Sequence, residues 1–166
     1  MEPATQAQTQ KGTHKGSVVG AQTHTSSDFL TIVIAGQIFG IPILQVQDVL
    51  GAQKVTHIPL ARPEVAGSLN LRGRIVTAID VRCRLNLPPR AEKQKEMSVV
   101  VEHENELYSL IIDEVGDVMS LHDKDFENNP ATLDALWRSV SAGIYRLEDR
   151  LLVVLDVPKL LDTVHV

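Results

Sequence analysis

Runs of apolar residues divide this chain into short β-strands. Apolar and β-branched side chains dominate residues 29–34 and 38–41, and Gly36 between them can adopt the positive φ that a tight turn requires. A second pair of such runs covers residues 98–101 and 107–112, with a short polar turn between them. The pattern therefore predicts two β-hairpins.

The first 27 residues lack this pattern. They contain no Leu, Ile or aromatic residue and consist mostly of Thr, Gln, Ser and Gly. Such a segment cannot bury enough apolar area to offset an ordering entropy of about 1 to 2 kcal/mol per residue. We therefore expect residues 1–27 to be a disordered tail and residues 28–166 to be the folded part.

The folded part contains an internal duplication. With a shift of 69 positions, residues 36–50 match residues 105–119 at 4 of 15 positions, and with a shift of 76, residues 67–85 match residues 143–161 at 6 of 19. Average residue usage would give roughly two or three matches over both segments together. The identical pairs include Val46 and Val115, Asp48 and Asp117, Val49 and Val118, Gly67 and Gly143, Arg74 and Arg150, and Asp80 and Asp156.

Short strands joined by tight turns close most economically as small barrels, because closure removes unpaired strand edges. We therefore expect a mainly β fold of two small barrels side by side, with short helices after Asp80-Val81 and Asp156-Val157. Two prolines and then alternating charges in residues 86–96 suggest barrels of about 28–90 and 91–166, with an exchange of elements between them left open. The different shifts place an insertion within residues 119–143, where 122–130 is expected to be a loop.

Composition narrows the functional classes. Lys and Arg total 16 against 21 Asp and Glu, a net charge of -5, which argues against a dedicated nucleic-acid binder. A lone cysteine, Cys83, excludes an internal disulfide and the usual zinc clusters. No apolar run approaches the roughly 18 residues that span a bilayer, and the N-terminus does not resemble a signal peptide, so we expect a cytoplasmic protein without direct membrane insertion.

No motif of a nucleophilic, phosphate-binding or zinc-dependent enzyme occurs, so we predict no catalytic residue, no cofactor and no metal. Two alternatives remain open. Asp113, Glu114 and Asp117 could form a metal or acid–base cluster, since hard cations favour grouped oxygen ligands. A local basic concentration could bind nucleic acid or, more in keeping with an acidic protein, an acidic partner surface. This concentration consists of Arg74, Arg82, Arg84 and Arg90.

Residues 67–82 provide the most specific motif. The sequence Gly-Ser-Leu-Asn-Leu-Arg-Gly followed by Asp80-Val81-Arg82 closely resembles the Gly-x-x-Asn-Leu-Arg-Gly…Asp-Leu-Arg signature of the CheW family of chemotaxis coupling proteins. Further segments also resemble that family, and the likeness covers about residues 29–161. The chain departs from the family pattern with Thr77 for Pro, Asp48 for Glu and Val81 for Leu. The supporting segments are 40–41, 46–49, 56–59, 112–118 and 155–161.

The resemblance implies two SH3-like five-stranded barrels and a non-enzymatic adaptor. Such an adaptor links the cytoplasmic tips of methyl-accepting chemoreceptors to the regulatory domain of the histidine kinase CheA, and it is recruited from the cytoplasm to receptor arrays at the membrane. A CheA-like pathway of surface motility or development is an alternative. Nucleic acid is not an expected partner.

The family pattern also implies binding residues. The receptor-binding candidates are Val46, Asp48, Val49, Arg72, Val115 and Val118, and the candidates for kinase binding or turn shaping are Gly67, Asn70 and Arg74. The alternative for the four valines is burial in a barrel core. Arg72 is replaced by Glu148 in the second copy, which favours a binding role over a folding role, although a salt bridge between the barrels is the alternative. Asn70 is expected to cap its turn, and Gly67 to relieve strain in one.

Overall fold

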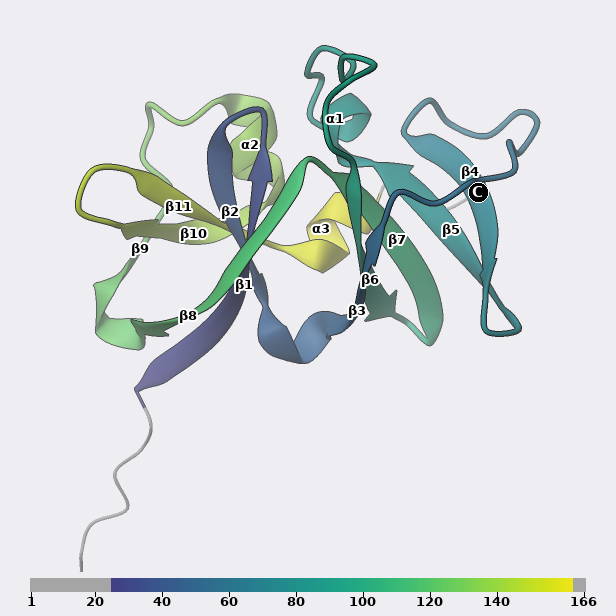
Figure 1. Cartoon of the computed structure of the whole chain (residues 1–166). Coiled ribbons are helices and arrows are strands. Elements are labelled where there is room, and N and C mark those ends of the chain that lie inside the picture. The colour runs from purple at the N-terminus through teal and green to yellow at the C-terminus, as the bar shows by residue number, and fades with distance from the viewer. Residues whose placement is uncertain (1–24, 163–166) are drawn as a thin grey trace, which may run out of the picture.

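The computed structural model describes residues 25–162 and shows a mainly β fold with short helices (Figure 1). The strands are β1 (Ser26–Ile34), β2 (Gln37–Pro42), β3 (Val46–Gly51), β4 (Val65–Leu71), β5 (Arg74–Asp80), β6 (Met97–His103), β7 (Glu106–Ile112), β8 (Glu114–His122), β9 (Phe126–Glu127), β10 (Ser141–Arg146) and β11 (Leu151–Leu155). The α-helices are α1 (Val81–Arg84), α2 (Ala135–Val140) and α3 (Val157–Leu161), and the 3-10 helices are η1 (Ile43–Gln45) and η2 (Asp123–Asp125).

Both predicted hairpins are confirmed, as β1–β2 and β6–β7. The predicted tail lies for the most part, in residues 1–24, outside the described part of the chain. Its last residues differ from the prediction, because β1 already begins at Ser26, which pairs with His122 of β8. The folded part therefore starts two residues earlier than the apolar pattern indicated, because backbone pairing extends past the apolar run.

The strands form two sheets, which appear as two lobes in Figure 1. The six-stranded sheet has the order β8-β1-β2-β11-β10-β9, and the five-stranded sheet has the order β3-β6-β7-β5-β4. Each sheet thus combines the hairpin of one copy with the remaining strands of the other copy. The chain therefore does not divide between the sheets at the expected boundary near residue 90, because the two hairpins are exchanged across it.

The two sheets repeat the same register. Phe39 of β2 lies beside Val153 of β11 in a parallel pair, and the duplicated positions Tyr108 of β7 and Thr77 of β5 form the matching parallel pair. The antiparallel β1–β8 and β3–β6 pairs each contain an irregularity at the repeated Val-x-Asp-Val segment. The repeated register of these strand pairs supports the duplication inferred from the sequence.

The pairs Asp80-Val81 and Asp156-Val157 begin short helices, as predicted. The side chain of Asp80 accepts a hydrogen bond from the backbone N–H of Cys83 at 3.3 Å, and that of Asp156 accepts one from Lys159 at 3.1 Å. An aspartate in this position satisfies one of the free N–H groups of the first helical turn. The two aspartates are therefore N-caps of α1 and α3.

Gly67 and Gly143 lie inside strands β4 and β10 and not in turns, so the expectation that Gly67 relieves turn strain is wrong. Both mark the irregularity where their strand shifts register, and both have a neighbouring backbone pressed against them. A Cβ at Gly67 would lie 2.3 Å from the carbonyl oxygen of Thr56, and one at Gly143 would lie 2.6 Å from that of Glu127. Glycine is needed at both positions because no side chain fits there.

One apolar core extends through both sheets. It includes Ile32 and Phe39 from the six-stranded sheet, Val99 and Leu110 from the five-stranded sheet, and Leu160 of α3, all of them fully buried. Figure 1 shows α3 between the two lobes. Packing of this shared core fixes the two sheets against each other.

The second copy differs from the first where the insertion was predicted. The segment 122–130 is not simply a loop, because it contains η2 and the short strand β9, which pairs with β10. Helix α2 follows, and its Trp137 ring packs against the Phe39 ring, with the ring centres 5.4 Å apart and the ring planes inclined by 53°. The inserted residues thus add a helix that covers the core.

Candidate docking surface

The four duplicated valines divide into an inward and an outward pair. Val46 and Val115 are half-buried and pack against the shared core. Val49 and Val118, at the other repeated position, are 38% and 53% exposed. Strands β3 and β8 are outer strands of their sheets, so each sheet presents one outward valine on an edge strand.

Asp48 and Arg72 form an ion pair beside Val49. Nη2 of Arg72 lies 3.3 Å from Oδ2 of Asp48, and Oδ1 of Asp48 accepts a hydrogen bond from the N–H of Val49 at 2.8 Å. The Arg72 side chain is 82% exposed. Oδ2 of Asp48 is buried and accepts no hydrogen bond from the residues that the structure describes, so the contact with Arg72 is ionic and loosely aligned. Such a guanidinium keeps most of its donors available.

A two-residue turn holds Arg72 in place. Leu71 pairs with Arg74, and the residues between them, Arg72 and Gly73, both have positive φ, of 51° and 86°. This is the geometry of the tight turns that match strand twist in hairpins. Oδ1 of Asn70 accepts a hydrogen bond from the N–H of Gly73 at 2.9 Å, which confirms that Asn70 caps the turn.

The partner of Arg72 differs from the alternative considered for it. Asp48 belongs to β3 and Arg72 to the β4–β5 turn, so the ion pair lies within the five-stranded sheet and does not join the two sheets. Because β3 and β4 are at opposite ends of the strand order, the pair shows that the outer strands of this sheet approach each other. The backbone bridge between Thr56 and Ser68 shows the same approach.

Arg74 lies at the start of β5 next to an exposed apolar residue. It lines a surface hollow of about 370 Å³ with Ile75, Glu106 and Leu107, and Ile75 is 78% exposed. At the equivalent place on the six-stranded sheet Gln37 takes the position of Glu106, and its amide donates hydrogen bonds to the carbonyl oxygens of Ile38 and Leu151, both at 2.8 Å.

Arg82 and Arg90 are not part of a free basic surface. Both donate to the carboxylate of Asp113, Arg82 at 2.8 and 2.6 Å and Arg90 at 3.1 and 2.8 Å. Arg84 instead donates to the carbonyl oxygens of Lys159 and Leu160 at the end of α3. Three of the four arginines that are grouped in the sequence therefore bind groups within the protein itself. This removes the main support for nucleic-acid binding.

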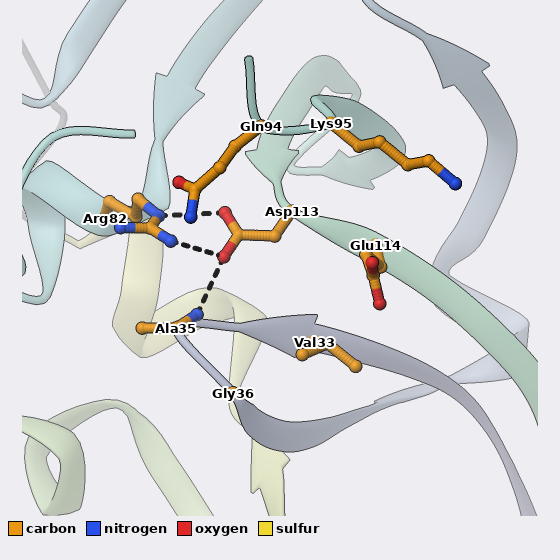
Figure 2. A pocket seen from close by; sticks show the side chains of 8 residues that line it. All are labelled: Val33, Ala35, Gly36, Arg82, Gln94, Lys95, Asp113 and Glu114. Atoms are coloured by element: carbon orange, nitrogen blue, oxygen red, sulfur yellow. Dashed lines mark hydrogen bonds and ion pairs between the residues drawn. The ribbon is translucent and has the colours of Figure 1, made fainter. Parts of the chain in front are cut away.

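Asp113 remains charged in this setting. Burial alone would raise the pKa of its carboxyl, but hydrogen bonds from Arg82, from the N–H of Ala35 and from Arg90 favour the charged form and lower the pKa to about 2. Figure 2 shows Arg82 and Ala35 converging on the two oxygens of Asp113 at the edge of a polar hollow. A carboxylate with these partners is unsuited to hold a metal ion, which weakens the metal-dependent alternative.

Three strongly exposed apolar residues were not singled out from the sequence: Ile75, Leu60 in the β3–β4 connection, and Leu44 of η1, the last 92% exposed. Periodicity could not identify them, because an apolar residue at a strand end or in a connection has no preferred face. Nor could periodicity separate Val46 from Val49, because the register shift between Val46 and Asp48 interrupts the two-residue alternation of the strand.

Within residues 25–162, no group of three or more His, Cys, Asp or Glu side chains could hold a metal ion. No helix in that same part of the chain is long and apolar enough to cross a membrane.

The chain is similar to known proteins both in sequence and in fold. The chain is 28% identical over 142 residues to the chemotaxis protein CheW of Bacillus subtilis (strain 168), covering 86% of this chain and 91% of that protein. It is 27% identical over 120 residues to the protein PilI of Pseudomonas aeruginosa, covering 72% of this chain and 67% of that protein. The scaffolding protein TtCheW of Thermoanaerobacter tengcongensis shares the fold, with a TM-score of 0.70 at 24% identity over 78% of this chain and 88% of that one.

The family model of the CheW-like domain matches residues 28–165, which include nearly all of the folded part. This match agrees with the resemblance of residues 67–82 to the CheW-family signature. It also agrees with the strand arrangement that the two sheets repeat. The chain belongs to the CheW-like domain family.

Proposed function

We propose that this protein is a non-enzymatic scaffold that couples methyl-accepting chemoreceptors to the regulatory domain of a CheA-like histidine kinase. It would act in the cytoplasm and be recruited to receptor arrays at the membrane. The support is membership of the CheW-like family and the names of relatives, which are chemotaxis and scaffolding proteins. The structure adds two sheets that present equivalent exposed valines.

The observation that most favours this function is the outward pair Val49 and Val118. Each is apolar, exposed and located on an outer strand, and the duplication places them at equivalent positions of the two sheets. We assign them to contact with the apolar side of a receptor helix. Asp48 and Arg72 lie at one end of this surface and would pair with polar groups of the same helix.

The inward valines take a different role. Val46 and Val115 pack against the shared core, so in this proposal they support the docking surface from beneath. Their contact with the receptor would be indirect.

The kinase would bind elsewhere on the five-stranded sheet. The hollow beside Arg74 and Ile75 combines an exposed apolar side chain with a cation and with the carboxylate of Glu106. We assign it to the regulatory domain of the kinase, with Ile75 as the apolar anchor and Arg74 as the charged contact. Gly67 and Asn70 then serve by shaping β4 and its turn.

Calorimetric titration with the isolated regulatory domain of the CheA-like kinase from the same organism tests the proposal. Saturable one-to-one binding with a Kd of about 1 μM or tighter is expected. Ile75→Glu should abolish the heat of binding, whereas Val118→Glu should leave it unchanged because that residue is assigned to the receptor. Absence of heat from two demonstrably folded proteins would contradict the proposal.

The relationship to PilI favours a second candidate, a role as the adaptor of a non-flagellar CheA-like pathway. The same titration separates the two. Parallel experiments with the regulatory domains of every CheA-like kinase in the genome should show one partner bound at least about tenfold more tightly, a difference of about 1.4 kcal/mol. The pathway of that kinase identifies the function.

A further inference from the structure

The most strongly connected polar group outside the docking surface is Asp113, which lies where the chain passes from one sheet to the other. It follows Ile112, the last residue of β7 in the five-stranded sheet, and precedes Glu114, the first residue of β8 in the six-stranded sheet. Strand β8 is an outer strand that pairs with β1 alone among the described strands. The first residue of β8, Glu114, pairs with Val33 of β1, so Asp113 lies directly before the paired part of the strand.

Several separate elements meet at the Asp113 carboxylate. Arg82 comes from α1, Arg90 from the connection between α1 and β6, and the N–H of Ala35 from the β1–β2 turn, which donates at 2.8 Å. We call Arg82, Arg90, Asp113 and the Ala35 N–H the Asp113 clamp. Figure 2 shows Arg82 meeting the carboxylate from one side and Ala35 from below, while the ammonium group of Lys95 points away.

The clamp is rigid because its parts are held independently. The Arg82 side chain is only 9% exposed, and its Nη1 also donates to the carbonyl oxygen of Pro88 at 2.9 Å. The backbone N–H of Asp113 donates to the carbonyl oxygen of Val33 at 3.2 Å. A bidentate arginine–carboxylate contact fixes orientation as well as distance.

The duplication shows that the fold does not require this clamp. At the equivalent crossing from the six-stranded to the five-stranded sheet, the position of Asp113 is taken by Leu44 and that of Arg82 by Pro158. Leu44 is 92% exposed, yet the strands on that side have the same register. The two copies thus fold alike with and without the clamp, so the clamp serves something that only one crossing needs.

We propose that Asp113 is a positioning residue that holds the start of β8, and with it Val118, in a fixed place relative to Val49 on the five-stranded sheet. This inference rests on the proposed docking role of the two valines. A receptor helix that contacts both valines needs a constant separation between them, and every variation in that separation lowers affinity. The clamp supplies this constancy at the crossing that leads directly into β8.

The test measures the geometry without any partner. In a Cys83→Ser background, cysteines introduced by Gln47→Cys on β3 and Asp117→Cys on β8, both exposed positions, are spin-labelled, and the distance between the labels is measured by electron paramagnetic resonance. Asp113→Asn should broaden or shift the distance distribution. Leu44→Asp, which changes the equivalent crossing, should leave it unchanged.

Arg90→Gln is the second variant, in case Asp113→Asn fails to fold. It removes two of the contacts to Asp113 and leaves the Arg82 pair in place, so a smaller broadening is expected. Distance distributions identical to that of the unchanged protein in both folded variants would overturn the proposal. Because no receptor is present, this outcome is independent of the binding experiments, so failure of the positioning role and failure of the docking role can be told apart.

Discussion

The Nη2 atom of Arg72 lies 3.3 Å from Oδ2 of Asp48, and this contact joins the two ends of the five-stranded sheet. It places Arg72, in the β4–β5 turn within the motif of residues 67–82, beside the exposed Val49. Two residues that the family resemblance implied as receptor contacts are thus partners of each other. The proposed docking surface therefore combines an apolar residue with a partly satisfied charge pair.

Arg72→Glu should weaken receptor binding while the fold is retained. The substitution places two carboxylates together, but the side chain is 82% exposed, and exposed ion pairs contribute only about 0 to 1 kcal/mol to stability. Titration with a receptor fragment and thermal unfolding measure the two effects. The double variant Asp48→Arg/Arg72→Glu restores the internal pair, and if it also restored binding, the contact of Arg72 with the receptor would be disproved.

The outward and inward valines should respond differently. Val49→Glu and Val118→Glu are each expected to reduce receptor binding by about tenfold or more, because a charge would be buried in the apolar contact. Val46→Ala and Val115→Ala should instead destabilise the fold, by about 1 kcal/mol, since they leave space beside the core. Chemical unfolding and titration on the same samples distinguish the two classes, and equal binding loss without destabilisation in both classes would contradict the assignment.

Gly67→Ala and Gly143→Ala should each destabilise the protein by more than about 2 kcal/mol, because the new Cβ meets a neighbouring carbonyl oxygen at 2.3 or 2.6 Å. Gly51→Ala is the matched control. No atom lies within 4 Å of a Cβ built there, so little change is expected. Urea unfolding of the three variants measures the differences, and a stability of Gly67→Ala equal to that of Gly51→Ala would refute the close approach of Thr56.

Stability should fall in acid through Asp113. Its pKa is about 2 in the fold against an ordinary 3.8, so the unfolded chain takes up the proton first as the pH falls. The stabilisation is therefore complete above about pH 4 to 5 and is lost as the pH approaches 2, a loss of about 2 kcal/mol. Urea unfolding between neutral and acid pH should show this loss in the unchanged protein and not in Asp113→Asn. Parallel pH profiles of the two proteins would count against it.

The sequence alone determined the local features. Apolar runs around turn residues predicted both hairpins, the repeated aspartates predicted the starts of α1 and α3, and Asn70 was correctly placed as the cap of its turn. These features depend on residues that lie within a few positions of one another. The duplication and the family resemblance were also readable because repeated and motif residues are matched by identity and spacing.

The tertiary structure decided everything that depends on partners distant in the chain. Exchange of the hairpins puts β1 beside β8, and β6 beside β3, and the apolar pattern of a strand does not specify which strand lies beside it. Arg82 was expected on a basic surface and is buried against Asp113, 31 positions away, because a charge at that depth needs an opposite charge. The exposure of Val49, Ile75 and Leu44 follows from which strands cover them, and strand periodicity specifies the faces of a strand but not its neighbours.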